Sequence, residues 1–141
     1  MALCVLMAGC AEATPPAAWV RECPREAFCF TRPADLLAQP VQAIDSLALS
    51  YRNPKLSLVV DMGRYGTSTA HLVAATETSL TVSGRPARLL STEREWVLVV
   101  PKVYDTDAIN VQFSMTLRFE GKASAELAQR IFQSIEFKPR R

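Results

Sequence analysis

The segment Asn110-Val-Gln-Phe-Ser-Met-Thr-Leu-Arg-Phe-Glu120 (NVQFSMTLRFE) contains the clearest structural pattern in this chain. Within it, apolar residues alternate with polar ones at every second position: Val111, Phe113, Met115, Leu117 and Phe119. An alternation with period two is typical of a β-strand that buries one face and exposes the other. The strand over 110–120 therefore needs neighbouring strands and a cover for its apolar face.

The cover follows directly in the sequence. After Gly121 the apolar spacing changes to that of one helical stripe: Leu127, Ala128, Ile131, Phe132 and Ile135. Ser124 is suited to cap the first turn, and Glu126 lies near the positive end of the helix dipole. We expect this amphipathic helix to pack on the sheet face that carries Phe113, Met115 and Leu117.

Upstream segments supply the remaining strands. We expect strands at 28–31, 47–51, 56–62, 71–75, 79–83, 88–90 and 95–100, with a turn at 83–86. Residues 34–39 are compatible with one or two helical turns before Pro40. The predicted fold class is α+β, with an antiparallel β-sheet of about five to seven strands and a C-terminal amphipathic helix packed on one face.

Length and composition limit the classes of protein. The chain has 141 residues, of which 49% are hydrophobic, and this is the usual size of one globular domain. Its 16 basic and 14 acidic residues leave a net charge of +2 without any block of like charge. This balance argues against a nucleic-acid partner and against intrinsic disorder.

The first ten residues predict a processing signal. Residues 1–9 are uncharged and apolar or small, and Leu6-Met-Ala-Gly-Cys10 looks like a bacterial lipobox. We therefore expect residues 1–9 to be removed, Cys10 to be the lipid attachment site, and the lipid to be the only contact with the membrane. No basic residue precedes the apolar run, which a start codon further upstream would explain. The alternative is a buried N-terminal strand or helix.

Residues 10–22 are predicted to form a flexible Pro/Ala tether, and residues 23–141 a single binding domain. Ala11 follows the cysteine where Asp would direct retention, and this favours the outer membrane. Cys4 leaves with the leader, so Cys23 and Cys29 remain in an oxidising compartment, where we expect them to form a disulfide. A metal or redox pair would need a second ligand pair or the usual two-residue spacing, which the sequence lacks.

No constellation of residues predicts catalysis or a cofactor. His71 is the only histidine and lies outside any nucleophile motif, so we expect a protein that is not an enzyme. Asp105 and Asp107 resemble two calcium-ligand positions but lack the glycine and the distant Glu of an EF-hand loop, so no metal is expected there. A small hydrolase or ligand carrier that uses scattered acids stays open as an alternative.

Recognition is the remaining function. Arg64, Tyr65, Tyr104, Asp105 and Asp107 are expected on loops, where Tyr and Arg often form interface hot spots and acids supply complementarity. Arg85 and Arg88 form a further loop group. Each of these groups is also compatible with a simple solubilising hairpin tip.

The layout resembles a set of small bacterial envelope lipoproteins. The shared marks are the lipobox Cys10, Ile44-Asp-Ser46 at a strand entry, Asp61-Met-Gly63 at a hairpin, and a late helix that ends in Ile135-Glu-Phe137. Within that set, the chain resembles the periplasmic immunity lipoproteins that neutralise peptidoglycan-degrading effectors of type VI secretion, especially muramidases. The resemblance implies a toxin inhibitor that plugs the effector's substrate groove through a protein–protein interaction.

Glu126 and the loop with Asp105 and Asp107 are our candidates for reaching such a groove. The alternative is an accessory lipoprotein of envelope assembly or stress, which binds an endogenous envelope protein. A concave pocket with convergent polar groups would favour an enzyme or carrier, whereas a pocket-poor surface with protruding loops would favour an inhibitor.

Overall fold

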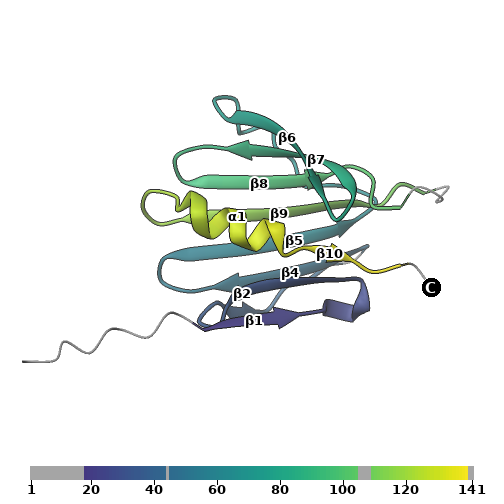
Figure 1. Cartoon of the computed structure of the whole chain (residues 1–141), viewed down its shortest axis with the longest axis horizontal. Helices are drawn as coiled ribbons and strands as arrows, with labels where there is room; N and C mark the ends of the chain where they lie inside the picture. The colour runs from purple at the N-terminus through teal and green to yellow at the C-terminus, as the bar shows by residue number, and fades with distance from the viewer. Residues whose placement is uncertain (1–17, 44, 105–108, 140–141) are drawn as a thin grey trace, which may run out of the picture.

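The computed structural model describes residues 18–43, 45–104 and 109–139. In this part of the chain the fold is mostly β, with antiparallel sheets of three and seven strands and one α-helix (Figure 1). The elements in chain order are β1 (Trp19–Glu22), the 3-10 helix η1 (Pro24–Glu26), β2 (Phe28–Pro33), β3 (Leu37–Gln39), β4 (Ser46–Arg52), β5 (Leu56–Gly63), β6 (Thr76–Val82), β7 (Arg85–Ser91), β8 (Glu95–Val100), β9 (Gln112–Phe119), α1 (Ala125–Gln133) and β10 (Glu136–Phe137).

The predicted strand over 110–120 is β9, at the centre of the large sheet. The strand order is β3-β4-β5-β9-β8-β7-β6, and β9 pairs with β5 on one side and with β8 on the other. Phe113, Met115 and Leu117 are fully buried. The alternation in the sequence thus correctly identified the strand and its buried face.

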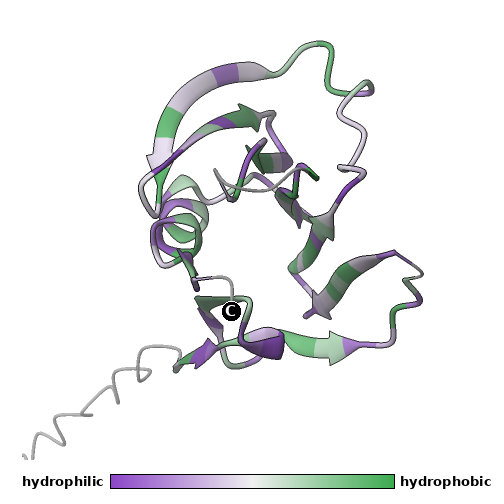
Figure 2. Cartoon of the chain, turned by 90° about the vertical axis from the view of Figure 1, so that its right-hand side faces the viewer, coloured by the Kyte–Doolittle hydropathy of each residue, from purple (hydrophilic) through white to green (hydrophobic). Residues whose placement is uncertain are grey.

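Helix α1 follows β9 and shares its core. The Ser124 hydroxyl accepts a hydrogen bond from the Leu127 amide at 3.2 Å, as the capping pattern predicts. Ala128, Ile131 and Phe132 are buried in one cluster with residues of the large sheet. Figure 2 shows the large sheet bent into an arc, with α1 on the inner side of the arc.

The small sheet has the order β1-β2-β10 and contributes aromatic rings to the same core. The Phe113 ring of β9 lies 5.1 Å from the Phe28 ring and 5.1 Å from the Phe137 ring, both edge to face. Through these rings β2 and β10 meet the central strand β9.

The opposite face of the large sheet is also buried over β7 and β8, and at Ser114 of β9. There Leu90, Val97 and Val99 form a second cluster with Leu72, which belongs to the segment between β5 and β6. Because this segment covers the outer face, β8 is buried on both sides, and its buried residues do not alternate with exposed ones.

Three expectations from the sequence were wrong. Ala34 and Asp35 form a turn and Leu37–Gln39 a strand, because β4 offers backbone partners that a short helix would forgo. Residues 71–75 form turns that cover the second cluster, and the strand begins at Thr76.

The third expectation was that the flexible tether extends to residue 22. Strand β1 already pairs with β2 from Trp19 onward, so the folded domain begins before that boundary. The Trp19 ring lies under the Arg130 guanidinium, 3.8 Å from its central carbon. Ordered structure therefore precedes Cys23. Among the described residues, no helix has the length and apolar character needed to cross a membrane.

Candidate functional site

One end of the molecule collects most of the residues predicted to bind a partner. It lies at the right in Figure 1, where β5 ends and β9 begins, and it faces the viewer in Figure 2. We call it the distal end and define it by Arg25, Arg64, Tyr65, Tyr104 and Ile109. It is distal because β1 begins at the opposite end of the molecule (Figure 1).

The first groove of the distal end is open and carries exposed apolar side chains. It has a volume of about 630 Å³ and runs between Arg25, Met62, Tyr65 and Ile109. Tyr65 is 70% exposed and Ile109 is 56% exposed, although large apolar side chains are usually covered. The Arg64 guanidinium lies 5.7 Å from the centre of the Tyr65 ring. The groove thus combines apolar surface with two arginines and one acid, Asp45.

A second groove adjoins the first. It has a volume of about 650 Å³ and is lined by Arg25, Glu26, Tyr104 and Lys138, and it shares Arg25 and Ala27 with the first groove. The two grooves therefore form one continuous surface with Arg25 between them.

The wall between the grooves has an unusual backbone. Arg25 and Glu26 adopt φ angles of 48° and 55°, in the left-handed region that side chains other than glycine rarely occupy. The predicted disulfide is confirmed, and Cys23–Cys29 joins the two ends of this segment. Backbone strain of this kind, of order 1 kcal/mol or more per residue, is often found at binding sites.

The structure brings together some of the predicted binding residues and separates others. Arg64 and Tyr65 line the first groove of the distal end, and Tyr104 lines the second. Asp105 and Asp107, and the predicted lipid site Cys10, lie outside the described residues. Glu126 is exposed in the first turn of α1, which begins at the opposite end of the molecule (Figure 1).

Arg85 has a supporting position. Its Nε donates to the Val103 carbonyl at 2.8 Å, one guanidinium nitrogen donates to the Ser83 carbonyl at 2.6 Å, and its Cζ lies 5.1 Å from the centre of the Phe137 ring. It thereby ties the β6–β7 turn to the segment that leads to Tyr104. Arg88 instead forms an exposed ion pair with Glu77 at 3.5 Å.

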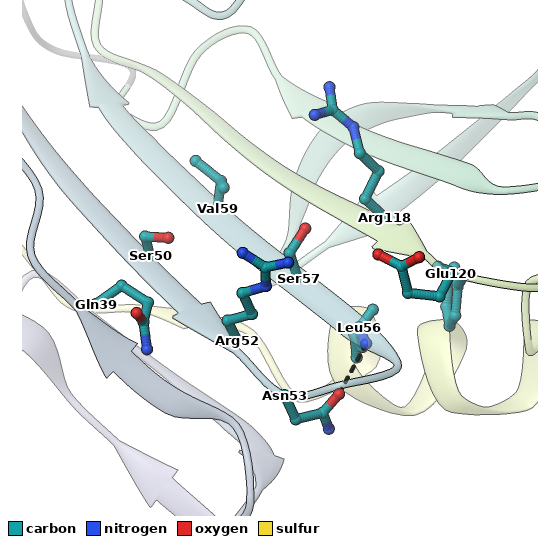
Figure 3. A pocket seen from close by; sticks show the side chains of 10 residues that line it. Gln39, Ser50, Arg52, Asn53, Leu56, Ser57, Val59, Arg118 and Glu120 are labelled. Atoms are coloured by element: carbon teal, nitrogen blue, oxygen red, sulfur yellow. Dashed lines mark hydrogen bonds between the residues drawn. The ribbon is translucent and has the colours of Figure 1, made fainter.

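A polar groove that the sequence did not predict lies on the outer face of the large sheet (Figure 3). It has a volume of about 500 Å³ and is lined by Ser50, Arg52, Ser57, Arg118 and Glu120, among others. Except for Glu120, which directly follows β9, these residues come from the polar positions of β4, β5 and β9, so the alternation predicted their exposure but not their arrangement around a groove.

Arg118 is linked to the single histidine, His71, through Glu95. Arg118 and His71 both contact Oε1 of Glu95, at 3.3 Å and 3.1 Å respectively. Across 18–43, 45–104 and 109–139, no three His, Cys, Asp or Glu side chains lie close enough together to hold a metal ion. His71 therefore joins the segment over the second cluster to β8 and β9.

A half-buried polar cluster joins the two sheets. Arg32 of β2 donates to Oε1 of Glu22 at 2.6 Å, and the Tyr51 hydroxyl donates to Oε2 of Glu22. The hydrogen bond from Arg32 is the main reason that the pKa of Glu22 is lowered. Burial is the main reason that the pKa of Tyr51 is raised, and the bond to Glu22 adds to it. Each side chain here is paired within the fold, so we assign the cluster to stability.

Comparison with known proteins adds no assignment. The chain matches no protein family model, no curated protein and no solved structure. The distal end is the candidate site because it combines two adjoining grooves, exposed Tyr65 and Ile109, and the strained Arg25 segment.

Proposed function

We propose that this protein is a lipid-anchored periplasmic immunity protein, which binds a peptidoglycan-degrading effector of the muramidase type and blocks its substrate groove. The observation that carries the proposal is the exposure of Tyr65 and Ile109 in a groove flanked by Arg25, at the end of the molecule away from the start of β1. Aromatic side chains and arginines concentrate at interface hot spots, whereas charged rims control orientation.

The chemistry of the distal end suits this kind of target. A muramidase groove binds an extended sugar polymer and contains catalytic acids. Arg25 and Arg64 offer positive charge to those acids beside the distal end's own Asp45 and Glu26, whereas Lys138 pairs with Glu136 at 3.6 Å. Tyr65 offers a ring and a hydroxyl in place of a sugar. A protein that occupies the groove presents no glycosidic bond, so it inhibits without being cleaved.

The direction of the chain suits an anchored inhibitor. With the lipid on Cys10 in the outer membrane, the short tether enters the domain at the start of β1, and the distal end points away from the membrane. In this arrangement α1 packs on the Phe113 face of the large sheet, so the helix supports the core and stays out of the interface.

Co-expression tests the proposal. The probe is a muramidase effector directed to the periplasm, produced with or without this protein; where the neighbouring gene encodes such an effector, that one is used. We expect the wild-type protein to prevent lysis and to form a complex with the toxin on size exclusion. Continued lysis together with no complex would refute the immunity function. A neighbouring gene for envelope assembly would instead support the accessory role.

Variants locate the interface. Tyr65→Ala should weaken the complex at least tenfold, as expected for a hot spot. Arg25→Gly should weaken it without loss of thermal stability, because glycine adopts a φ of 48° without strain. Leu37→Ala is the matched control, since Leu37 is 63% exposed and pairs with Arg52 at the far end of β4. Loss of binding in Leu37→Ala alone would place the interface elsewhere.

A further inference from the structure

Strand β6 leaves one edge of the large sheet open. It is the last strand in the sheet order, pairs only with β7 among the described strands, and lies near the top of the molecule in Figure 1. In the described part of the chain, no backbone hydrogen bond outside the β6–β7 ladder involves residues 76–82. A row of backbone donors and acceptors is therefore available to another strand.

The other edges are protected and this one is not. The edge strands β1, β3 and β10 have only four, three and two residues. Pro40 directly follows β3, and Pro139 follows β10 after one intervening residue. Natural edge strands are usually short or carry Pro, Lys or bulges, which prevent pairing with other chains. β6 has seven residues, Thr-Glu-Thr-Ser-Leu-Thr-Val, and its one charged side chain, Glu77, pairs with Arg88 of the same chain.

The hairpin turn determines which backbone groups face outward. Val82 and Arg85 close a two-residue turn, so they form a hydrogen-bonded pair, and the pattern then alternates along the strand. The N–H and C=O groups of Glu77, Ser79 and Thr81 consequently point away from β7. Glu77 and Thr81 lie two residues before and two residues after Ser79, so the three outward-facing positions are symmetric about Ser79.

We propose that two copies of this chain pair their β6 strands antiparallel about a two-fold axis at Ser79, which joins their large sheets into one. In this register Ser79 faces Ser79 of the second copy and Glu77 faces Thr81 of the second copy. Each pair exchanges two backbone hydrogen bonds, and the two Glu77 carboxylates do not face one another. The isologous contact closes the assembly at two copies.

A small groove beside the β6 edge supports pairing with a second copy of the chain. It has a volume of about 170 Å³ and is lined by Leu80, Val82, Leu89 and Phe132, among others. Facing residues of antiparallel strands project to the same side, so Thr78 and Thr76 of the second copy would lie beside Leu80 and Val82. Their methyl groups would cover apolar surface that one copy leaves open. The β6 edge is separate from the distal end, and the inference does not rest on the proposed function.

The test is the mass in solution of the full chain, made without lipid by Cys10→Ser. We expect sedimentation equilibrium between about 1 and 200 µM to show a concentration-dependent dimer. Ser79→Lys should weaken the dimer at least tenfold, because it places two lysines face to face at the axis. Thr81→Lys is the matched control: its lysine would face Glu77 of the second copy, so dimerisation should be unchanged or stronger.

Both positions are exposed, and circular dichroism establishes that the variants fold. Tyr65→Ala, at the distal end, should leave the dimer unchanged. A wild-type monomer at every concentration would overturn the proposal. Equal dimerisation of wild type and Ser79→Lys would also overturn it, since the interface would then lie away from the β6 edge.

Discussion

Two carboxyl groups show how different surroundings change the effect of pH on stability. The Glu22 carboxylate accepts hydrogen bonds from Arg32 and Tyr51, which favour its charged form and lower its pKa. Burial is the main reason that the pKa of the Asp61 carboxyl is raised. Its Oδ1 is buried without a partner, and only the Ser46 hydroxyl reaches its Oδ2, at 3.5 Å.

Asp61→Asn should stabilise the protein at pH 7 by about 1 kcal/mol, since it removes a poorly compensated buried charge. A folded-state pKa that is raised contributes stability below the unfolded pKa, and this is lost as pH rises through the folded pKa. The advantage of the variant should therefore disappear toward pH 3. Thermal unfolding across pH measures it, and an advantage that persists unchanged at pH 3 would contradict the assignment to charge.

Glu22→Gln should have the opposite profile. At pH 7 we expect a loss of about 1–2 kcal/mol, because Arg32 keeps its charge and loses its carboxylate partner. The contribution of Glu22 is present above its unfolded pKa and is lost as pH falls through the lowered folded pKa, so the difference should narrow in acid. Glu77→Gln, in the exposed pair with Arg88, is the control and should change stability by only a few tenths of a kcal/mol. A loss that is equal at pH 3 and pH 7 would show that the ion pair is not its cause.

At the scale of the elements, the hairpin between β6 and β7 depends on two residues with positive φ. Ser83 and Gly84 have φ angles of 49° and 76°, which match the twist of a tight two-residue hairpin. The Ser83 hydroxyl also accepts from the Phe137 amide at 3.1 Å, so the turn holds the last strand of the chain.

Gly84→Ala should lower the stability by about 1 kcal/mol, because an L side chain is strained at this φ although space is open around it. Gly121→Ala is the matched control, since Gly121 has equally open space and no positive φ. Denaturant unfolding of both variants separates conformational strain from steric contact. Equal effects of the two substitutions would contradict the strain argument.

Patterns in the sequence were sufficient to predict some elements but not others. β9 and α1 were predictable because each has a long apolar period that one structure alone satisfies. Residues 34–39 were not, because three residues carry little periodicity and the pairing of β3 with β4 decided their conformation. The 71–75 segment has an apolar pattern that serves to cover the outer cluster rather than to form a strand.

At the scale of the whole molecule, the disulfide fixes the wall of the distal end. Reduction of Cys23–Cys29 should lower the stability by about 2 kcal/mol, as expected for a small loop, and should weaken the proposed complex because Arg25 and Glu26 lose their constraint. Thermal unfolding and binding, each with and without reductant, measure both effects. Cys23→Ser is the control, since its stability should not respond to reductant, and a wild-type protein that is equally insensitive would contradict this role.

Local patterns in the sequence were sufficient to predict the strand over 110–120, the helix that follows it and the disulfide pair, because each depends on local period or on cysteine count. The sequence also predicted Arg64, Tyr65 and Tyr104 as recognition residues. Their grouping with Arg25 and Ile109 at one end of the molecule depends on tertiary packing, since the five residues come from segments up to 84 positions apart and the pairing of β5 with β9 brings Tyr65 and Ile109 together. Likewise only the sheet order left β6 at an open edge, because strand order depends on packing across the whole core and not on the pattern of any one strand.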